Sequence, residues 1–410
     1  MIFRSAHRND PFRGSRPLFA TCDAGLENLL KRELQALGAA ECALAHRGVH
    51  FAGDKRSLWR VNLGSRFANR VLLPVAEFPA LDRKALYDGV HRIQWPTWFG
   101  VRRTLAVDAS THKNPLAHSG FVAQVVKDAI CDRFREQFDA RPSVDRKNPD
   151  IVVNARLHGD RCVVSLCSSG QRLHRRGYRI EAGPAPLKET LAAAMVTQSG
   201  WTPGMPLVDP MCGAGTIVIE AALMAAGIGP GTLRINRAGF SFMRWHNFQK
   251  GEFDEVLATL DAQMTQEPSE AMICGFDIDT RAVAMAQRNA HRAGIEAWLN
   301  FESQALIYLK PRPQWTKGFL VTNPPYGERM GEAEEVQALY GLLGEILRDR
   351  FKGFKAGILI PEESPSRALG LSPDRRFSMR NGPLPCRLFC CSVYDGPRRK
   401  SPTTAASDRE

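Results

Sequence analysis

The sequence lacks a long apolar segment. Its longest apolar run lies around residues 217–229 and is interrupted by Glu220, so it falls short of the roughly 18–20 residues that span a bilayer. The first residues carry arginines and no apolar stretch of the kind that forms a secretory signal. We therefore expect a cytoplasmic protein with no membrane partner.

Patterns that hold metals or nucleoside triphosphates are also missing. The ten cysteines contain no CxxC pair followed by a second one, and no HExxH is present, so we predict no metal site. We interpret the cysteines as reduced, buried residues. The glycine-rich stretches lack both GxGxxG and GK[ST], which disfavours a nicotinamide-dependent oxidoreductase and a P-loop NTPase.

Acidic residues are scarce in the first half of the chain. Residues 1–190 hold 31 Lys and Arg against 19 Asp and Glu, whereas residues 191–410 hold 24 of each, so the net charge of +12 lies entirely in the first half. Such asymmetry predicts that this half binds a polyanion, for which nucleic acid is the natural candidate. The alternative is a solvated basic surface. The candidate RNA-binding residues close the basic half: Arg172, Arg175, Arg176 and Arg179.

The pattern of secondary structure changes near residue 187. Before it, short strands accompany helices expected over 25–37 and 121–138, which indicates an α+β region. After it, strands alternate with helices, which indicates an α/β, doubly wound, mostly parallel sheet. Residues 227–270 interrupt this pattern, and we interpret them as an insertion beside the ligand pocket.

A glycine turn and an acidic strand end mark one ligand site. The turn Asp209-Pro-Met-Cys-Gly-Ala-Gly-Thr216 follows an apolar strand and opens a helix, and ligands bind at the carboxyl ends of strands in such sheets. Gly213 and Gly215 would let the backbone approach a ligand closely. Asp277 ends a second strand, where a carboxylate can bind ribose hydroxyls, and Asp279 is expected to cap the next helix.

The sharpest motif is Asn323-Pro324-Pro325-Tyr326, directly after an expected strand over 318–322. The two prolines restrict the backbone. The Asn323 side-chain oxygen and the Pro324 carbonyl would then form two acceptors for an exocyclic amine, and Tyr326 offers a face on which a base can stack.

These motifs resemble those of class I S-adenosylmethionine-dependent methyltransferases that act on amines. The resemblance extends over residues 16–395 to the THUMP-domain RNA methyltransferases, in particular the bacterial enzymes that methylate a guanine N2 of 23S ribosomal RNA. It is carried by the stretches FATCDAGLENLLKREL, VVSLCSSGQRLHRRGYR, APLKETLAAAM, DPMCGAGTIVIEAA and TNPPYGERMG.

The resemblance implies a Rossmann-like methyltransferase domain preceded by ferredoxin-like and THUMP RNA-binding regions. It implies that Asp209, Gly213 and Gly215 line the methionine part of the cofactor, Asp277 its ribose, and the Asn323 motif the target base. The implied divisions are a disordered tail (1–15), a ferredoxin-like segment (16–75), a THUMP domain (76–170), a basic linker (171–186), the methyltransferase domain (187–395) and a flexible tail (396–410).

The sequence departs from the family pattern in two places. Relatives carry an acidic residue near Ala305 that binds the adenine amine, and Gln304 is our candidate substitute. Cys167 replaces another acid, with an effect expected on packing only. Some relatives are fused to a second methyltransferase domain. Because this sequence ends near residue 410, we expect it to carry one methylation activity.

The implied reaction is an in-line transfer of a methyl group to the amine, which needs positioning more than a strong base. Three alternatives stay open: an adenine N6 target in RNA, a protein glutamine target, and a non-catalytic RNA-binding factor in ribosome assembly.

Overall fold

The computed structural model describes residues 12–179, 187–265, 268, 270, 272–326 and 332–394. The expected tail at 396–410 and most of that at 1–15 lie outside these residues. Phe12 is described, and its burial in the core shows that the expectation of disorder is wrong at this position.

The first half is built on one continuous eight-stranded sheet, in the order β2-β3-β1-β4-β8-β7-β5-β6. The long strand β4 joins its two parts, because Leu72 pairs with Phe19 of β1 on one side and with Cys167 of β8 on the other. The domain boundary expected at residues 75 and 76 falls inside this strand. The strands are β1 (Arg16–Thr21), β2 (Ala40–Ala45), β3 (Gly48–Gly53), β4 (Arg70–Pro79), β5 (Thr104–His112), β6 (Ser143–Val144), β7 (Ile151–His158) and β8 (Arg161–Cys167).

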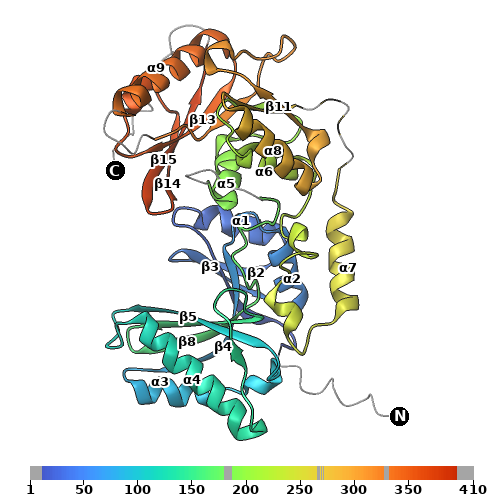
Figure 1. The fold of residues 1–410 in the computed structure, drawn as a ribbon, viewed down its shortest axis with the longest axis vertical. Coiled ribbons are helices and arrows are strands. Elements are labelled where there is room, and N and C mark those ends of the chain that lie inside the picture. Colours follow the sequence, from blue (N-terminus) through green and yellow to red (C-terminus); the bar gives the residue numbers. More distant parts are fainter. Residues whose placement is uncertain are drawn as a thin grey trace, which may run out of the picture.

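Four helices cover this sheet, and Figure 1 shows them in two pairs. Helices α1 (Glu27–Ala36) and α2 (Lys55–Gly64) accompany β1–β4, while α3 (Arg83–His91) and α4 (Ser119–Phe138) pack together under the strands β5, β7 and β8. The helices expected over 25–37 and 121–138 are thus confirmed as α1 and α4. Strands β7 and β8 form an antiparallel hairpin that turns at residues 159 and 160.

The second half contains a seven-stranded sheet in the order β11-β10-β9-β12-β13-β15-β14. Its first five strands are parallel, and β15 runs antiparallel to both of its neighbours, β13 and β14, which confirms the mostly parallel sheet. The strands are β9 (Leu207–Asp209), β10 (Ile273–Asp277), β11 (Leu299–Ser303), β12 (Phe319–Thr322), β13 (Lys355–Pro361), β14 (Arg375–Asn381) and β15 (Leu384–Ser392).

Helices lie on both faces of this sheet. Side chains of successive strand residues point to opposite faces. Leu207 therefore joins the core beneath helices α5, α6 and α8, and Val208 joins the core beneath α9 on the other face. The helices are α5 (Glu189–Ser199), α6 (Thr216–Ala225), α8 (Thr280–Ala293) and α9 (Glu332–Arg350).

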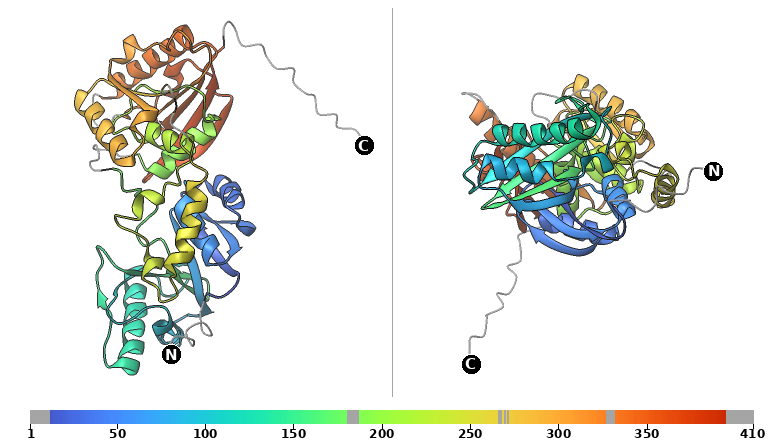
Figure 2. Two further views of the ribbon diagram at one scale, coloured as in Figure 1. Left: turned by 90° about the vertical axis from the view of Figure 1, so that its right-hand side faces the viewer. Right: turned by 90° about the horizontal axis from the view of Figure 1, so that it is seen from below.

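Helix α7 (Lys250–Asp261) belongs to the expected insertion but lies elsewhere than predicted. It packs along α2 of the first half (Figures 1 and 2). Trp59 of α2 contacts the rings of Phe242, Phe248 and Phe253. The prediction that this segment lies beside the ligand pocket is therefore wrong: its aromatic residues bury themselves against the first half.

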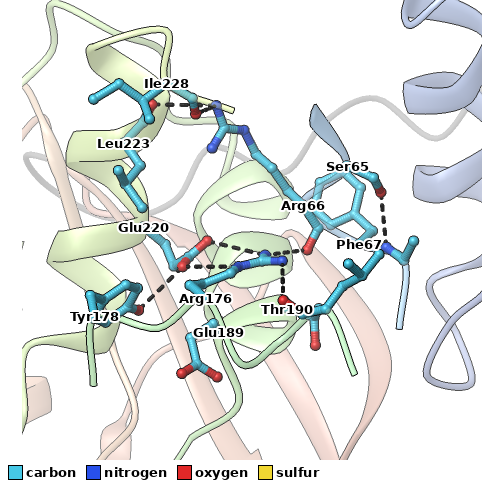
Figure 3. Close-up of polar contacts among 12 residues, drawn as sticks. Ser65, Arg66, Phe67, Arg176, Tyr178, Glu189, Thr190, Glu220, Leu223 and Ile228 are labelled. Atoms are coloured by element: carbon cyan, nitrogen blue, oxygen red, sulfur yellow. Dashed lines mark hydrogen bonds and ion pairs between the residues drawn. The ribbon is translucent and has the colours of Figure 1, made fainter. Parts of the chain in front are cut away.

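A buried ion pair connects the two halves, as Figure 3 shows. The Arg176 guanidinium lies 3.4 Å from the carboxylate of Glu220 on α6, and the two side chains are 1% and 0% exposed. Arg176 also donates to the backbone carbonyls of Leu173 and Arg66, at 2.9 and 2.7 Å. The Tyr178 hydroxyl donates to the same carboxylate. Three parts of the chain therefore share one buried charge cluster.

Close backbone packing reinforces the connection. The amide of Gly231 donates to the carbonyl of Leu63 at 2.8 Å, and a Cβ on Gly231 would lie 2.2 Å from the carbonyl oxygen of Asn62. Only glycine permits this approach. At the surface, Lys55 forms an ion pair with Glu252 of α7.

We predict that Arg176→Ala lowers the free energy of unfolding by about 3–5 kcal/mol, because it leaves the Glu220 carboxylate buried without its partner. Urea denaturation measures this loss. The matched control Arg175→Ala removes an exposed arginine one position away and should change stability by less than about 0.5 kcal/mol.

The double variant Arg176→Met with Glu220→Leu removes both charges and should recover most of the loss. Equal, small effects of Arg176→Ala and Arg175→Ala would contradict the structural role given to the pair.

Candidate functional site

The predicted motifs meet at one edge of the second sheet. Strand β9 lies between β10 and β12, so the chain order reverses beside it, and ligands bind in the crevice outside the strand ends at such a position. Asp209 ends β9, Asp277 ends β10, and Asn323 follows β12. Sheet topology thus brings together residues separated by more than 100 positions.

The glycine turn after β9 is held by β10. The amide of Gly213 donates to Asp277 Oδ2 at 2.9 Å, and the amide of Cys212 donates to the Phe276 carbonyl at 2.8 Å. Gly213 has φ +52°, and a Cβ there would meet nothing within 4 Å. The backbone is therefore open to a ligand at this point. Gly215, by contrast, allows close packing, because its Cβ would lie 2.9 Å from Ala286 Cβ.

Asp209 carries an unusual carboxyl group. It is 1% exposed, and burial raises its pKa from 3.8 to about 7, with the nearby Asp277 charge adding to the rise. Among the described residues no cationic side chain forms an ion pair with it. The amide of Met211 donates to its Oδ1 at 3.2 Å, and the Thr322 hydroxyl, together with this amide, partly offsets the rise in pKa. A buried carboxyl without a cation is suited to a positively charged ligand group.

Asp277 and Asp279 have different structural roles. Asp279 is the N-cap of α8, and its side chain accepts from the amide of Arg281, which confirms the predicted cap. The Asp277 carboxylate accepts from the amides of Gly213 and Asp279. Each of its oxygens keeps a further acceptor site, and ribose binding stays a prediction.

Gln304 lies directly after β11, next to Asp277. Its backbone amide donates to the Asp277 carbonyl at 3.0 Å, while its side chain makes no hydrogen bond with the described residues. This backbone contact places Gln304 at the same end of the sheet as the glycine turn. Contact with adenine stays a prediction.

The Asn323 motif presents an unsatisfied acceptor. Asn323 is half-buried, and its Oδ1 is buried without a hydrogen-bond partner in the described structure, which costs about 1–3 kcal/mol. Pro324 is buried, Pro325 is exposed, and Tyr326 is half-buried. Burial raises the pKa of the Tyr326 phenol, which stays protonated. An incoming N–H donor would satisfy the Asn323 oxygen.

The basic segment has two faces rather than one. Arg172 and Arg175 are exposed, and RNA contact by them stays a prediction. Arg176 is buried in the ion pair described above, so its prediction as a surface RNA ligand is corrected: burial makes it a structural residue.

Arg179 is also turned inward. Its guanidinium donates to Thr216 Oγ1 at 2.9 Å and to the Leu187 carbonyl at 2.6 Å, and it lies 3.3 Å from the Glu189 carboxylate. Thr216 begins α6 directly after Gly215. Arg179 therefore supports the glycine turn and is not displayed to RNA, which corrects the second of these predictions.

Sequence reasoning missed the residues that contact these arginines. Glu189 and Glu220 lie on helices α5 and α6, where an isolated acidic residue in a run of alanines and aliphatic residues was the only available signal.

Within the described residues no cluster of three or more His, Cys, Asp or Glu side chains could hold a metal ion. Cys212 in the glycine turn is buried, and burial raises the pKa of its thiol. None of the described helices combines the length and apolarity needed to cross a membrane.

Comparison with known families divides the chain into three consecutive stretches. Residues 17–72 match the RlmL ferredoxin-like domain, residues 81–166 the THUMP domain, and residues 176–389 the RMKL-like methyltransferase domain.

Individual relatives agree with this division. The chain is 43% identical over 380 residues to the ribosomal RNA large subunit methyltransferase K/L of Syntrophotalea carbinolica, covering 90% of this chain and 53% of the relative. It is 39% identical over 381 residues to a putative RNA methyltransferase of Synechocystis sp., covering 93% and 97%. The chain thus spans about half the length of the K/L relatives that it matches.

A solved structure extends the likeness to three dimensions. A putative methyltransferase complexed with SAH is 30% identical, superimposes with a TM-score of 0.83, and is covered completely by 94% of this chain. Together with the three matched stretches, this shows that the chain belongs to the RMKL-like methyltransferase family and carries an RlmL-type ferredoxin-like domain and a THUMP domain before the methyltransferase domain.

Proposed function

We propose that the chain is an S-adenosylmethionine-dependent RNA methyltransferase that modifies an exocyclic amine of ribosomal RNA, specifically a guanine N2 of 23S RNA. Two comparisons support this: the K/L relative is named for the large-subunit RNA, and the solved relative holds SAH. The net positive charge of the first half supports an RNA partner.

The glycine turn suits the proposed cofactor. S-adenosylmethionine supplies a methyl group activated by its sulfonium charge. The open backbone at Gly213 leaves room that a Cβ would fill, and the buried Asp209 carboxyl would bind the ammonium of the methionine part. Asp277 would bind ribose hydroxyls through its remaining acceptor sites, and Gln304 the adenine.

The observation that carries the proposal is the buried Asn323 oxygen at the switch point of the sheet, which has no hydrogen-bond partner in the part of the chain that the structure describes. An exocyclic amine has two N–H donors, which the Asn323 oxygen and the Pro324 carbonyl would accept. These contacts would hold the amine with its lone pair directed at the methyl group, and Tyr326 would stack on the base. Catalysis then depends mainly on positioning the amine. No strong base is needed, because the proton can leave the amine after methyl transfer.

Adenine N6 is the alternative target, since its amine has the same two donors. The experiment that separates the two gives the purified chain labelled S-adenosylmethionine and protein-free 23S or 16S RNA, followed by nucleoside digestion and mass spectrometry. N2-methylguanosine from 23S RNA supports the proposal, and N6-methyladenosine would replace guanine by adenine. Cofactor binding without any product would argue against the RNA target, and no cofactor binding would favour a non-catalytic RNA-binding factor.

We predict that Asn323→Ala lowers the rate of methyl transfer by about 100-fold or more, because it removes a polar contact to the reacting group. Cofactor affinity, measured by calorimetry, should stay within about twofold, a change worth only about 0.4 kcal/mol.

Asn300→Ala is the matched control, since it removes an asparagine near the opposite end of strand β11. Equal activity of the Asn323→Ala and Asn300→Ala variants would rule out the role given to the Asn323 oxygen.

Asp209→Asn should change stability and cofactor binding in opposite directions. The folded state raises the pKa of Asp209 from 3.8 to about 7, so it favours the protonated carboxyl, and stability is lost as pH rises toward 7. Asparagine lacks this ionisation. The variant should gain roughly 1–3 kcal/mol relative to the parent between pH 5 and pH 8, while its affinity for the cofactor falls.

Thermal unfolding of the ligand-free proteins at the two pH values measures the first effect, and calorimetry measures the second. A stability difference that is the same at both pH values would show that Asp209 does not titrate in this range.

A further inference from the structure

A basic cleft opens at the border between the THUMP domain and the start of the segment that leads to the methyltransferase domain. Its volume is about 350 Å³. One wall comes from the loop after β6, the other from the turn after β8, and the floor from small or apolar residues of the sheet. The lining includes Arg70, Arg146, Lys147, Val152, Arg172 and Arg175.

The cleft faces away from the helices α3 and α4. Leu105 of β5 packs in the core with α4, whereas its neighbour Ala106 and the next alternate residue, Asp108, line the cleft. Successive strand residues point to opposite faces, so the cleft lies on the face of the THUMP sheet that these helices leave open.

Positive charge dominates the lining. Among the described residues that line the cleft, five side chains are cationic and one is a carboxylate, Asp108, which pairs with Arg70. Burial lowers the pKa of His174 to about 3, so this lining residue is neutral at physiological pH. Within the described residues no carboxylate lies within 4 Å of the four cationic side chains other than Arg70. The cleft therefore has unmatched charge that favours an anion.

The wall formed by residues 169–172 is held in place from behind. The guanidinium of Arg234, which is 1% exposed, donates to the carbonyls of Ser169 and Gln171, each at 3.2 Å. The amide of Phe242 donates to the Ser168 carbonyl at 3.0 Å. The opposite wall is tied by Asp145, which accepts from the amides of Lys147 and Asn148. Because both walls are already held in place, ligand binding does not have to cover the entropy cost of ordering them.

We propose that this cleft binds consecutive phosphates of a single RNA strand, as an anchor separate from the site that holds the target base. This rests on the proposed RNA substrate. Arginine forks match phosphate oxygens, and the volume is too small for a duplex but suits the backbone of one or two nucleotides. Arg146 and Lys147 on one wall face Arg172 and Arg175 on the other, so a strand that lies between them contacts both.

The test uses the full chain and a fluorescein-labelled single-stranded RNA of about 20 nucleotides, with affinity measured by anisotropy over a range of KCl concentrations. Arg146→Ala with Lys147→Ala should weaken binding about tenfold and reduce the slope of log affinity against log salt by about 1.4, since each phosphate contact on a single strand adds about 0.7. Arg172→Ala with Arg175→Ala should act similarly.

The matched control is Arg83→Ala with Lys84→Ala, which removes the same charge from exposed positions of α3 on the covered side of the sheet. It should change affinity by less than about twofold. Equal weakening by the control would mean that long-range charge, and not the cleft, binds RNA, which would overturn the proposal.

Competition identifies the source of the phosphate. Inorganic phosphate and adenosine monophosphate should displace the RNA only at millimolar concentration. Binding of either small anion at micromolar concentration, lost in the cleft variants while RNA affinity is kept, would assign the cleft to a free anion and overturn the proposal.

The outcome is independent of methyl transfer. RNA binding is measured without cofactor, so loss of binding in the cleft variants would support the anchor even if no methylated nucleoside were found. Methyl transfer with unchanged RNA affinity in both cleft variants would contradict the anchor alone.

Discussion

The buried pair of Arg176 and Glu220 is the constraint on which the arrangement of the molecule depends. Arg176 comes from the basic segment that ends the RNA-binding half, and Glu220 comes from α6, the helix that the glycine turn opens. A charge buried away from water must keep its partner, because leaving one ion unpaired would lower the free energy of unfolding by several kcal/mol. The position of the glycine turn relative to the first half is therefore tied to a contact that cannot be broken cheaply.

The same short segment serves both halves through two different pairs of arginines. Arg172 and Arg175 reach the surface beside the THUMP domain, while Arg176 and Arg179 turn inward and hold α6 at Glu220 and Thr216. This organisation gives a physical reason for a cluster of arginines at a domain border: the outward ones can meet phosphate, and the inward ones are structural. Helix α7 and its aromatic neighbours stiffen the same border from the other side.

Local patterns predicted the elements well, whereas burial could not be predicted from them. Helix α8 begins directly after Asp279, the residue expected to cap it, because an N-cap is a local signal. The sequence predicted a doubly wound, mostly parallel sheet but not the order of its strands. The fold class alone was enough to place Asp209, Asp277 and Asn323 at the same end of the sheet, because the carboxyl ends of parallel strands lie together. The two faces of the arginine segment depend on tertiary contacts with Glu189 and Glu220, for which four arginines in a polar stretch contain no signal. The placement of the aromatic residues in the insertion expected over 227–270 was missed for the same reason: they could as well have lined a pocket as packed on Trp59.

In the proposed division of work, the first half anchors the RNA and the strand ends of the second sheet bind the target base, while the buried pair of Arg176 and Glu220 holds the two regions at a fixed separation. Steady-state kinetics of methyl transfer with the cleft variant Arg146→Ala with Lys147→Ala tests this division most directly. We expect KM for RNA to rise about tenfold while kcat is retained, because only binding that is equal in the ground state and the transition state is lost. A fall in kcat with unchanged KM for RNA would show that the two regions do not divide the work in this way.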